Sequence, residues 1–354
     1  MRKNYLKLFL IFKLNKKLTI LTKLKILVIG ANYGLLLAGM LIERNFDVYV
    51  IGNEKEVNSL NKEGFSFSFN DKFWKFKTSN KLKFFSNFKE DHYDLAIIAV
   101  QEPALSNLNI ANIISFISRR SIPVLSIMNI PFFQFLRDII GIKNIINPEK
   151  IYSSLNYSNL LNPRLIINTN PEPQIYAKAK FNELSIRLTG VFRCSSLNML
   201  NKEIILALTK SIENGLPVKI KSYESNWISL SKLPMLMAGN YRCLTNFKLR
   251  SIYEAVHEDI ILSQKIYNQV AEIMKILGAG RESVIPFKSY QKASIDLDAP
   301  SSVCRAITNR IQSVERVDKL IQTLGQSVNF YSSEIDTIVK NIDDSIKKFS
   351  TENN

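Results

Sequence analysis

The strongest constraint on the fold is a short apolar run that stops at a glycine. Lys25–Ile29 (KILVI) is followed at once by Gly30, which predicts a strand buried on both faces of a sheet. Gly34–Arg44 (GLLLAGMLIER) then predicts a helix, and Asp47–Ile51 (DVYVI) predicts a second strand. The buried-strand pattern returns in two later runs, Asp94–Val100 and Pro123–Ile127. Strands that alternate with helices predict a parallel sheet with right-handed crossovers.

The turn between the first strand and the first helix predicts a dinucleotide site. A glycine is needed where the strand turns and another where the helix packs on the sheet, and the pyrophosphate then lies at the helix N-terminus. Gly30 and Gly34 meet these two needs, with Asn32 at the middle position, where asparagine tolerates a positive φ. The loop is one residue shorter than G-x-G-x-x-G. We predict that the cofactor contacts Gly30, Ala31, Asn32, Tyr33 and Gly34; a domain that has lost its cofactor remains the alternative.

The end of the second strand chooses between NAD and NADP. An acid there would bind the ribose 2′-hydroxyl, whereas a basic group would accept a 2′-phosphate. The chain continues from Ile51 as Gly52-Asn53-Glu54-Lys55, with no acid directly at the strand end. We therefore favour NADP (NADPH), with Asn53 and Lys55 in the cofactor site, while Glu54 keeps NAD open.

The later part of the chain predicts helices in place of alternating strands. Apolar residues of Ser251–Leu277 recur three, four or seven positions apart, the stripe of an amphipathic helix. Further helical patterns cover Ser302–Leu324 and Ser332–Phe349. The expected fold is α/β, an N-terminal Rossmann-type parallel sheet domain plus a C-terminal all-helical domain. The predicted division is a basic N-terminal extension (1–23), a dinucleotide-binding domain (24–150), a linker with some β structure (151–195) and a helical substrate domain (196–350).

Composition narrows the partners. The formal net charge is +16 at pH 7, but lysine recurs along the whole chain and no stacking aromatics are interleaved with it as a nucleic-acid groove would need. We expect no nucleic-acid partner, and no stable membrane insertion because no apolar run is long enough. The basic extension is either a poorly ordered tail or a membrane-surface helix. Three distant cysteines fit a reducing, cytoplasmic compartment. With two histidines, His92 and His257, we expect no metal site.

The block KILVIGANYGLLLAGMLIERNFDVYVIGNEKEVNSLNKEGFSF resembles the opening of the ketopantoate reductase (2-dehydropantoate 2-reductase) family. The segment YDLAIIAVQEPAL is similar to the family's strand followed by Val-Lys, with Gln101 in place of the cofactor-facing lysine. VLSIMNIPF resembles the family's strand that ends Gln-Asn-Gly, which implies a substrate-binding role for Asn129. On this resemblance the chain is a divergent family member.

The helical half carries a second likeness. Ser231-Lys232-Leu233, with Asn240 eight residues after Lys232, is similar to the family's Lys-Leu-x-x-Asn-x-x-x-Asn, although Leu236 replaces the first asparagine. The resemblance implies that Lys232 is the catalytic general acid and that Asn240 binds substrate. Ala299-Pro300-Ser301-Ser302-Val303 resembles the late Ser-Ser-Met element, which implies a carboxylate contact from Ser302. The acidic substrate-binding role falls on Glu315 or Asp318.

The resemblance implies a two-domain architecture like that of 6-phosphogluconate dehydrogenase, with the active site between the domains. It also implies an NADP-dependent reductase of a small-molecule 2-oxo acid, possible as a homodimer. A lysine ammonium suits the reaction, because it can give a proton to the developing alkoxide when burial lowers its pKa. Two alternatives stay open. His257 with Asp259 could serve an opine-type dehydrogenase, and the chain could be a catalytically silent nucleotide-binding protein.

Overall fold

The computed structural model describes residues 24–178, 180–195, 197–209, 212–311 and 313–351. The predicted N-terminal extension, residues 1–23, lies outside this part of the chain. The described chain forms two compact units, and neither is continuous in sequence. The first unit comprises the described residues of 24–100, 112–127 and 164–224, and the second comprises those of 101–111, 128–163 and 225–351. In the described chain, no helix has the length and apolar character needed to cross a membrane.

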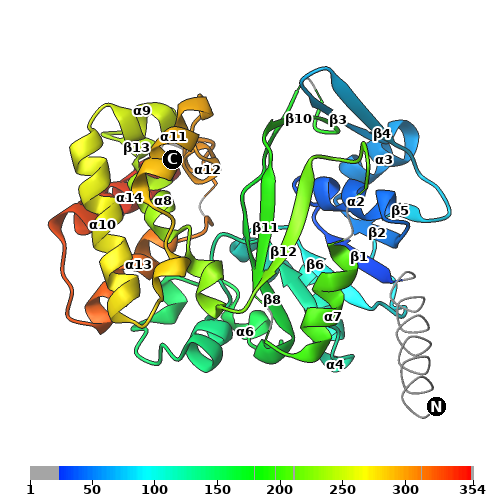
Figure 1. Ribbon diagram of the computed structural model, residues 1–354, viewed down its shortest axis with the longest axis horizontal. Coiled ribbons are helices and arrows are strands. Elements are labelled where there is room, and N and C mark those ends of the chain that lie inside the picture. The colour runs from blue at the N-terminus through cyan, green and yellow to red at the C-terminus, as the bar shows by residue number, and fades with distance from the viewer. Residues whose placement is uncertain (1–23, 179, 196, 210–211, 312, 352–354) are drawn as a thin grey trace, which may run out of the picture. The chain divides into compact units, whose positions relative to one another are not determined.

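The first unit is built on a mostly parallel sheet of eight strands (Figure 1). Their order across the sheet is β12-β11-β8-β7-β6-β1-β2-β5. All neighbours pair in parallel except β8 and β11, which are antiparallel. The strands are β1 (Lys25–Ile29), β2 (Asp47–Ile51), β5 (Leu82–Phe85), β6 (Leu95–Ile98), β7 (Val124–Ser126), β8 (Ile166–Pro171), β11 (Gly190–Ser195) and β12 (Val218–Tyr223). The predicted Rossmann-type parallel sheet is confirmed.

Helices cover this sheet because its central strands are apolar on both faces. The residues of β6 are all buried, as are four of the five in β1, so each face needs an apolar partner. The helices of the connections are α2 (Gly34–Glu43), α3 (Glu54–Glu63), α4 (Leu108–Arg119) and α7 (Met199–Leu208). Eight consecutive residues of α2, Gly34–Leu41, are buried, which explains why its sequence is apolar all round.

A second, four-stranded sheet lies in the same unit, in the order β4-β3-β10-β9. Its strands are β3 (Phe65–Phe69), β4 (Lys72–Phe76), β9 (Gln174–Ala177) and β10 (Glu183–Leu188). β3 and β4 form an antiparallel hairpin, and β3 pairs in parallel with β10, more than a hundred positions later. Phe65 and Phe76 stack at 4.9 Å between ring centroids. Phe65, Phe67 and Phe76 are therefore part of the hydrophobic core, whereas Phe73 is exposed.

The expected division of the chain differs from the observed one at residues 151–195. In place of a linker with some β structure, this segment supplies two strands of the main sheet, β8 and β11, and two of the second sheet. The physical reason is that parallel neighbours come from distant segments, so an edge of the sheet can be completed by chain that follows a long excursion. The chain enters the second unit directly after β6 and again soon after β7.

The second unit is helical. Its longer helices surround one hydrophobic core (Figure 1). A two-stranded antiparallel ribbon, β13 (Leu244–Thr245) with β14 (Lys248–Leu249), accompanies them. The helices are α5 (Phe133–Phe135), α6 (Leu155–Ser158), α8 (Leu233–Ala238), α9 (Ile252–His257), α10 (Ile260–Ile276), α11 (Phe287–Ala293), α12 (Ser302–Thr308), α13 (Val317–Ser327) and α14 (Ser333–Thr351).

Two of the three long helices predicted in this unit are interrupted. The pattern of Ser251–Leu277 is divided into α9 and α10, because the Asp259 side chain accepts a hydrogen bond from the Leu262 N–H at 2.9 Å and so starts a new helix. The pattern of Ser302–Leu324 is divided into α12 and α13. The third, Ser332–Phe349, is the single helix α14. The periodicity of apolar residues indicates which helix faces are buried, but it does not reveal an N-cap residue that starts a new helix within the pattern.

A buried ion network fastens α13 to α14. Arg316 donates to Asp318 at 2.7 Å and 3.0 Å and to Asp343 at 2.6 Å. The Asp318 side chain is fully buried, and Lys319 also reaches Asp343, at 3.0 Å. A charge buried this deeply is tolerated only because it is paired on both of its oxygens.

Replacing Arg316 by methionine should destabilise the packing of α13 against α14. Asp318 would lose its partner while remaining buried, which costs about 3–5 kcal/mol for a pair broken on one side. Lys319→Met is the matched control, because it removes a more exposed partner of the same network and should cost less than about 1 kcal/mol. Urea denaturation measures both. Equal costs for the two variants would show that the buried pair is not what holds the helices.

Candidate active site

The dinucleotide turn is built where the backbone must come close to the end of the neighbouring strand. Gly30 has φ +106°, and a Cβ placed there would lie 2.7 Å from Val100 Cγ1 and 3.0 Å from the Ala99 carbonyl oxygen. Only glycine fits this turn at the ends of β1 and β6. β1 is followed by β2 on one side and β6 by β7 on the other, so the strand order reverses between them. Such a reversal is the switch point at which ligands bind in open α/β sheets.

The N-terminus of α2 is open to an anion. Its N-cap, Tyr33, makes no side-chain capping bond, and its first turn contains no acidic residue. At Gly34 a Cβ would lie 2.8 Å from Val28 Cγ1, so the helix approaches the sheet closely. The Leu35 and Leu36 N–H groups donate to the Asn32 and Tyr33 carbonyls at 3.3 and 3.1 Å, so the helix dipole is what favours a phosphate here. The residues present therefore fit the pyrophosphate of a dinucleotide.

The members of this turn divide into ligand candidates and supports. Asn32 is exposed and Ala31 is buried. The Tyr33 hydroxyl donates to the Pro173 carbonyl, and its ring makes an edge contact with Phe192. Tyr33 therefore uses its side chain to hold the turn against the sheet, and only its backbone remains for a cofactor.

At the end of β2 the structure adds an acid that the sequence analysis missed. Asn53 caps α3 by accepting from the Glu56 N–H at 2.9 Å, while the Asn53 N–H donates to Glu56 Oε2 at 3.0 Å. This capping box turns the Glu56 carboxylate back to the strand end, where it lies 3.0 Å from the Cβ position of Gly52. Lys55 is exposed at the same helix start. The S/T/N-x-x-E spacing from Asn53 to Glu56 is the signal that could have placed this acid.

The second unit gathers several predicted site residues around one carboxylate. Asn129 Nδ2 donates to Glu315 Oε2 at 2.9 Å, and the Glu102 N–H donates to Glu315 Oε1 at 3.2 Å. The Glu315 side chain is buried. Its two oxygens thus take one donor each from the segments that follow β6 and β7, neighbouring parallel strands whose C-terminal ends lie at the same sheet edge.

Lys232 is the cation of this cluster. It is the N-cap of α8, 5% exposed, and its ammonium has no hydrogen-bond partner among the described residues. Burial lowers the pKa of Lys232 to about 8, and the nearby Glu315 opposes that change. Burial also raises the pKa of Glu315, against the hydrogen bond from Asn129 and the charge of Lys232. A buried ammonium with unused donors and a lowered pKa is suited to proton transfer.

Two tyrosines and a serine pair complete the framework of this cluster. The Tyr241 hydroxyl donates to the Glu315 carbonyl and accepts from the Val317 N–H at 3.1 Å. The Tyr152 hydroxyl donates to the Pro131 carbonyl at 3.0 Å, two residues beyond Asn129. Ser153 and Ser154 donate to the carboxylate of Glu102. None of these contacts was predicted, because each joins segments far apart in sequence.

The remaining predicted residues fall in different places. Asp318 is occupied by Arg316, so Glu315 is the acid that accompanies Lys232. Ser302 is exposed as the first residue of α12; its neighbour Ser301 is the N-cap and donates to the Asn240 carbonyl at 2.7 Å. The half-buried Asn240 begins a short 3₁₀ turn and does not cap α8 as a C-terminal residue. Gln101 is half-buried at the start of a 3₁₀ turn, without a side-chain cap bond.

The histidine alternative gains no support from the geometry. His257 stacks on Tyr253 at 4.6 Å between centroids, and its Nε2 lies 3.1 Å from Ser294 Oγ. Asp259 uses its carboxylate to cap α10. His257 and Asp259 therefore serve separate local structures and do not form the acid–histidine pair of an opine-type site.

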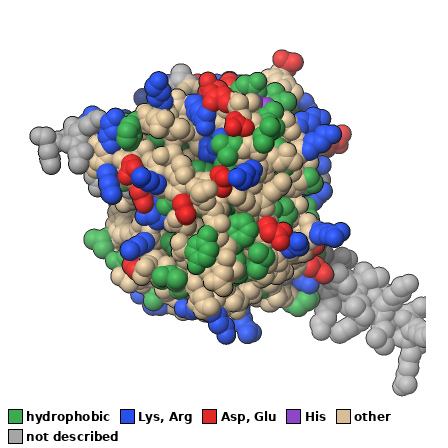
Figure 2. Space-filling model, turned by 90° about the vertical axis from the view of Figure 1, so that its left-hand side faces the viewer, with side chains coloured by type: hydrophobic (Ala, Val, Ile, Leu, Met, Phe, Trp, Pro, Cys, Tyr) green, Lys and Arg blue, Asp and Glu red, His purple; other side chains and the backbone are tan. Residues whose placement is uncertain are grey.

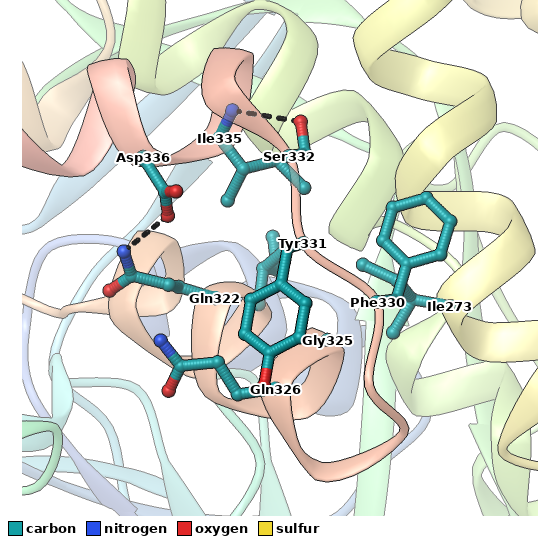
Figure 3. A pocket seen from close by; sticks show the side chains of 10 residues that line it. Ile273, Gln322, Gly325, Gln326, Phe330, Tyr331, Ser332, Ile335 and Asp336 are labelled. Carbon is teal, nitrogen blue, oxygen red and sulfur yellow. Dashed lines mark hydrogen bonds between the residues drawn. The ribbon is translucent and has the colours of Figure 1, made fainter.

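One small hollow in the second unit is separate from the predicted site residues (Figure 3). It is lined from α10, α13 and the start of α14, where Gln322 donates to Asp336 at 2.7 Å and the Ile335 N–H to Ser332 at 3.3 Å. On the face of the molecule shown in Figure 2, Lys and Arg side chains are scattered among Asp and Glu.

Among described residues, no group of three or more His, Cys, Asp or Glu could hold a metal ion.

Comparison with known proteins bears on the fold of the chain. Residues 26–129 match a protein family described as "Ketopantoate reductase PanE/ApbA". The match covers the N-terminal part of the chain, and the fold of the chain is that of the ketopantoate reductase-like oxidoreductases. Among curated proteins, none matches the sequence significantly.

Solved structures resemble this one over nearly its whole length. 2-Dehydropantoate 2-reductase from Methylococcus capsulatus is 12% identical with a TM-score of 0.63, covering 93% of this chain and 98% of its own. D-Mandelate dehydrogenase, solved with NADH and anilino(oxo)acetate, is 15% identical with a TM-score of 0.66, covering 92% and 100%. The dimeric ketopantoate reductase of Staphylococcus aureus is 10% identical with a TM-score of 0.61, covering 92% and 99%. At these identities the likeness establishes the fold.

Burial of Lys232 should make stability depend on pH. Because its pKa is about 8 in the fold and 10.5 ordinarily, the unfolded chain binds more protons between these values, and stability rises with pH across that window. We expect Lys232→Met to be more stable than the parent at pH 7, by about 2–3 kcal/mol, with the difference shrinking from about pH 8 to pH 10.5.

Urea denaturation at a series of pH values measures this difference. Lys340→Met, at an exposed position of α14, is the control and should stay within about 0.5 kcal/mol of the parent at every pH. If the stability advantage of Lys232→Met over the parent is no larger at pH 7 than at pH 10.5, the buried ammonium does not carry the cost assigned to it.

Proposed function

We propose that this protein is an NADP-dependent reductase that converts a 2-oxo acid to a 2-hydroxy acid. The observation that carries the proposal is the buried ammonium of Lys232, whose donors are unused among the described residues and whose neighbour Glu315 is held by Asn129 and Glu102. In such a cluster a keto oxygen is the kind of acceptor that the ammonium lacks. The reduced nicotinamide, when bound, supplies the hydride for C2 of the substrate.

The protein's own part in the reaction is to hold and move a proton. Lys232 donates a hydrogen bond to the keto oxygen, which polarises the carbonyl, and transfers its proton to the alkoxide as that charge develops. Its lowered pKa makes this transfer easier near neutral pH. Glu315 keeps the lysine protonated before the reaction, and Asn129 and Asn240 offer amides that orient substrate without adding charge. Ser302 is proposed as the carboxylate contact, since its hydroxyl lies at the start of α12.

Leu236 bears on the substrate. It lies one helical turn after Lys232, with its N–H bonded to the Lys232 carbonyl at 2.9 Å, so the two residues share a face of α8. Where the resembling family has a polar asparagine, this chain presents an apolar side chain. We therefore expect a 2-oxo acid with an apolar substituent to be reduced faster than ketopantoate. We also propose a homodimer, as the Staphylococcus aureus relative is dimeric, located in the cytoplasm.

An NADPH-oxidation screen over a panel of 2-oxo acids tests the proposal. Lys232→Ala should lose about 10²–10⁴-fold in kcat on whichever substrate is reduced, while its NADPH affinity is unchanged because the dinucleotide turn belongs to the other unit. Lys340→Met should be fully active. Near-normal turnover by Lys232→Ala would refute the mechanism, and absence of saturable NADPH binding would favour the catalytically silent alternative.

The relative affinity for NADPH and NADH tests the proposed role of the residues that follow β2. Lys55 is proposed to contact a 2′-phosphate, so NADPH should bind tighter than NADH, and Lys55→Glu should reduce that preference by about tenfold or more. Glu56→Gln is the matched variant: glutamine preserves the capping box but removes a charge that repels a 2′-phosphate, so NADPH preference should increase. Titration of cofactor fluorescence gives the affinities. Equal affinities of the parent protein for NADH and NADPH would contradict the proposed preference.

A further inference from the structure

Glu102 is a buried carboxylate for which the proposed reaction has no direct use. It is 1% exposed and follows β6 in a short 3₁₀ turn, Glu102–Ser106. Its Oε1 accepts from the Ser154 N–H at 2.8 Å and from Ser154 Oγ at 2.6 Å, and its Oε2 accepts from the Ser153 N–H at 3.1 Å. Three donors therefore converge on a side chain that, by composition alone, would be expected on the surface.

The backbone of the same residue touches the proposed catalytic cluster. The Glu102 N–H donates to Glu315 Oε1, across 213 positions of sequence. The Glu102 side chain thus holds the turn in place through Ser153 and Ser154. The Glu102 backbone N–H donates to Glu315. Any movement of the Glu102 carboxylate would move this donor.

We propose that Glu102 is a positioning residue of the reductase, which holds Glu315 by its backbone and, by its negative charge, limits the charge on Glu315 so that Lys232 gives up its proton readily. This inference rests on the proposed function. It assigns Glu102 an effect on the reaction that acts through Glu315 and needs no contact with substrate.

A neutral glutamine would satisfy two of the three donors without the cost of a buried charge, because its one amide oxygen can replace Oε1 but its amide nitrogen cannot accept from the Ser153 N–H. Glutamine could still accept from Ser154, and a buried ion is expensive unless its charge serves a purpose. The charge has an identifiable effect: it adds to burial in raising the pKa of Glu315, against the hydrogen bonds from Asn129 and Glu102. Burial raises the pKa of Glu102 itself, and its three serine donors oppose that change and favour the charged form.

Among the titratable groups near Glu315, Glu102 and Lys232 are the ones whose charges change its protonation. Tyr152 and Tyr241 are fully buried, and burial raises the pKa of each well above the ordinary value, so both stay neutral. Arg316 and Asp318 neutralise each other at 2.7 Å. A change in the charge at position 102 should therefore appear first at Glu315 and then at Lys232.

The direction of the effect of Glu102→Gln follows from these charges. Without the negative charge at position 102, Glu315 ionises more readily and attracts the Lys232 proton more strongly. Reduction needs protonated Lys232, so kcat should fall at high pH in the parent, and this alkaline fall should move upward by about half a pH unit or more in Glu102→Gln. A purely structural role would lower kcat at every pH and leave the fall where it was.

Ser154→Ala is the matched control. It removes the Oγ donor but keeps the Glu102 carboxylate and the Ser154 N–H, so it loosens the same contact without removing the charge. Its alkaline fall should coincide with that of the parent. If Glu102→Gln and Ser154→Ala have the same pH profile, the inference is wrong. Glu102→Asp and Glu102→Asn form a second pair for the case in which Glu102→Gln does not fold: Asp should retain the parent profile and Asn should shift it upward.

A titration without substrate separates this inference from the proposed function. The Lys232 Cε signal of protein labelled with ¹³C-lysine, assigned by its absence from Lys232→Met, reports the protonation of Lys232 directly. An upward shift of its midpoint in Glu102→Gln supports the inference even if no 2-oxo acid is reduced, in which case the proposed function alone fails. An unchanged midpoint overturns the inference even if the reductase activity is found.

Discussion

The carboxylate of Glu315 is the interaction on which the second unit's chemistry depends. It is buried, and it accepts one hydrogen bond from Asn129 and one from the Glu102 N–H. These donors come from the two points at which the chain leaves neighbouring strands of the main sheet. A parallel sheet delivers such strand ends to the same edge without regard to their distance in sequence. The order of strands thus determines which residues can meet Glu315, and Lys232 acquires a partner of opposite charge in an apolar interior.

A comparable constraint acts in the first unit. Gly30 must turn the chain against the Ala99 carbonyl, and the positive φ and missing Cβ of glycine allow it. The turn leaves α2 without a side-chain cap, and the Leu35 and Leu36 N–H groups donate to carbonyls of the turn itself. Tyr33 adds to this by bonding to Pro173 and packing on Phe192, which ties the turn to strands far along the chain. The proposed phosphate site thus rests on backbone geometry more than on particular side chains.

The sequence was informative wherever the signal was local, and it was silent wherever partners are distant. The strands and the turn Gly30–Gly34 follow from short patterns, whereas Asn129 and Lys232 were singled out by the resemblance of short motifs to a family. Glu102 could not be predicted, because its donors lie about fifty positions later and its acceptor lies 213 positions away. The choice of Glu315 over Asp318 depended on Arg316, which neutralises Asp318 in the fold. Residues 151–195 were misjudged because no regular alternation with helices marks β8 and β11, which lie inside the sheet between β7 and β12.

Lysine abundance makes Lys232 uninformative in the sequence and informative in the structure. A chain that accumulates lysine by composition places it where the cost is small, on the surface. Keeping an ammonium in an apolar interior lowers its pKa and costs stability, because the unfolded chain holds the proton more tightly. A general enrichment in lysine does not explain Lys232, because its burial lowers the stability of the fold and other interactions must offset that loss. A site that tolerates such a group, beside a carboxylate whose own protonation is held in balance, has the properties of a proton donor poised for use.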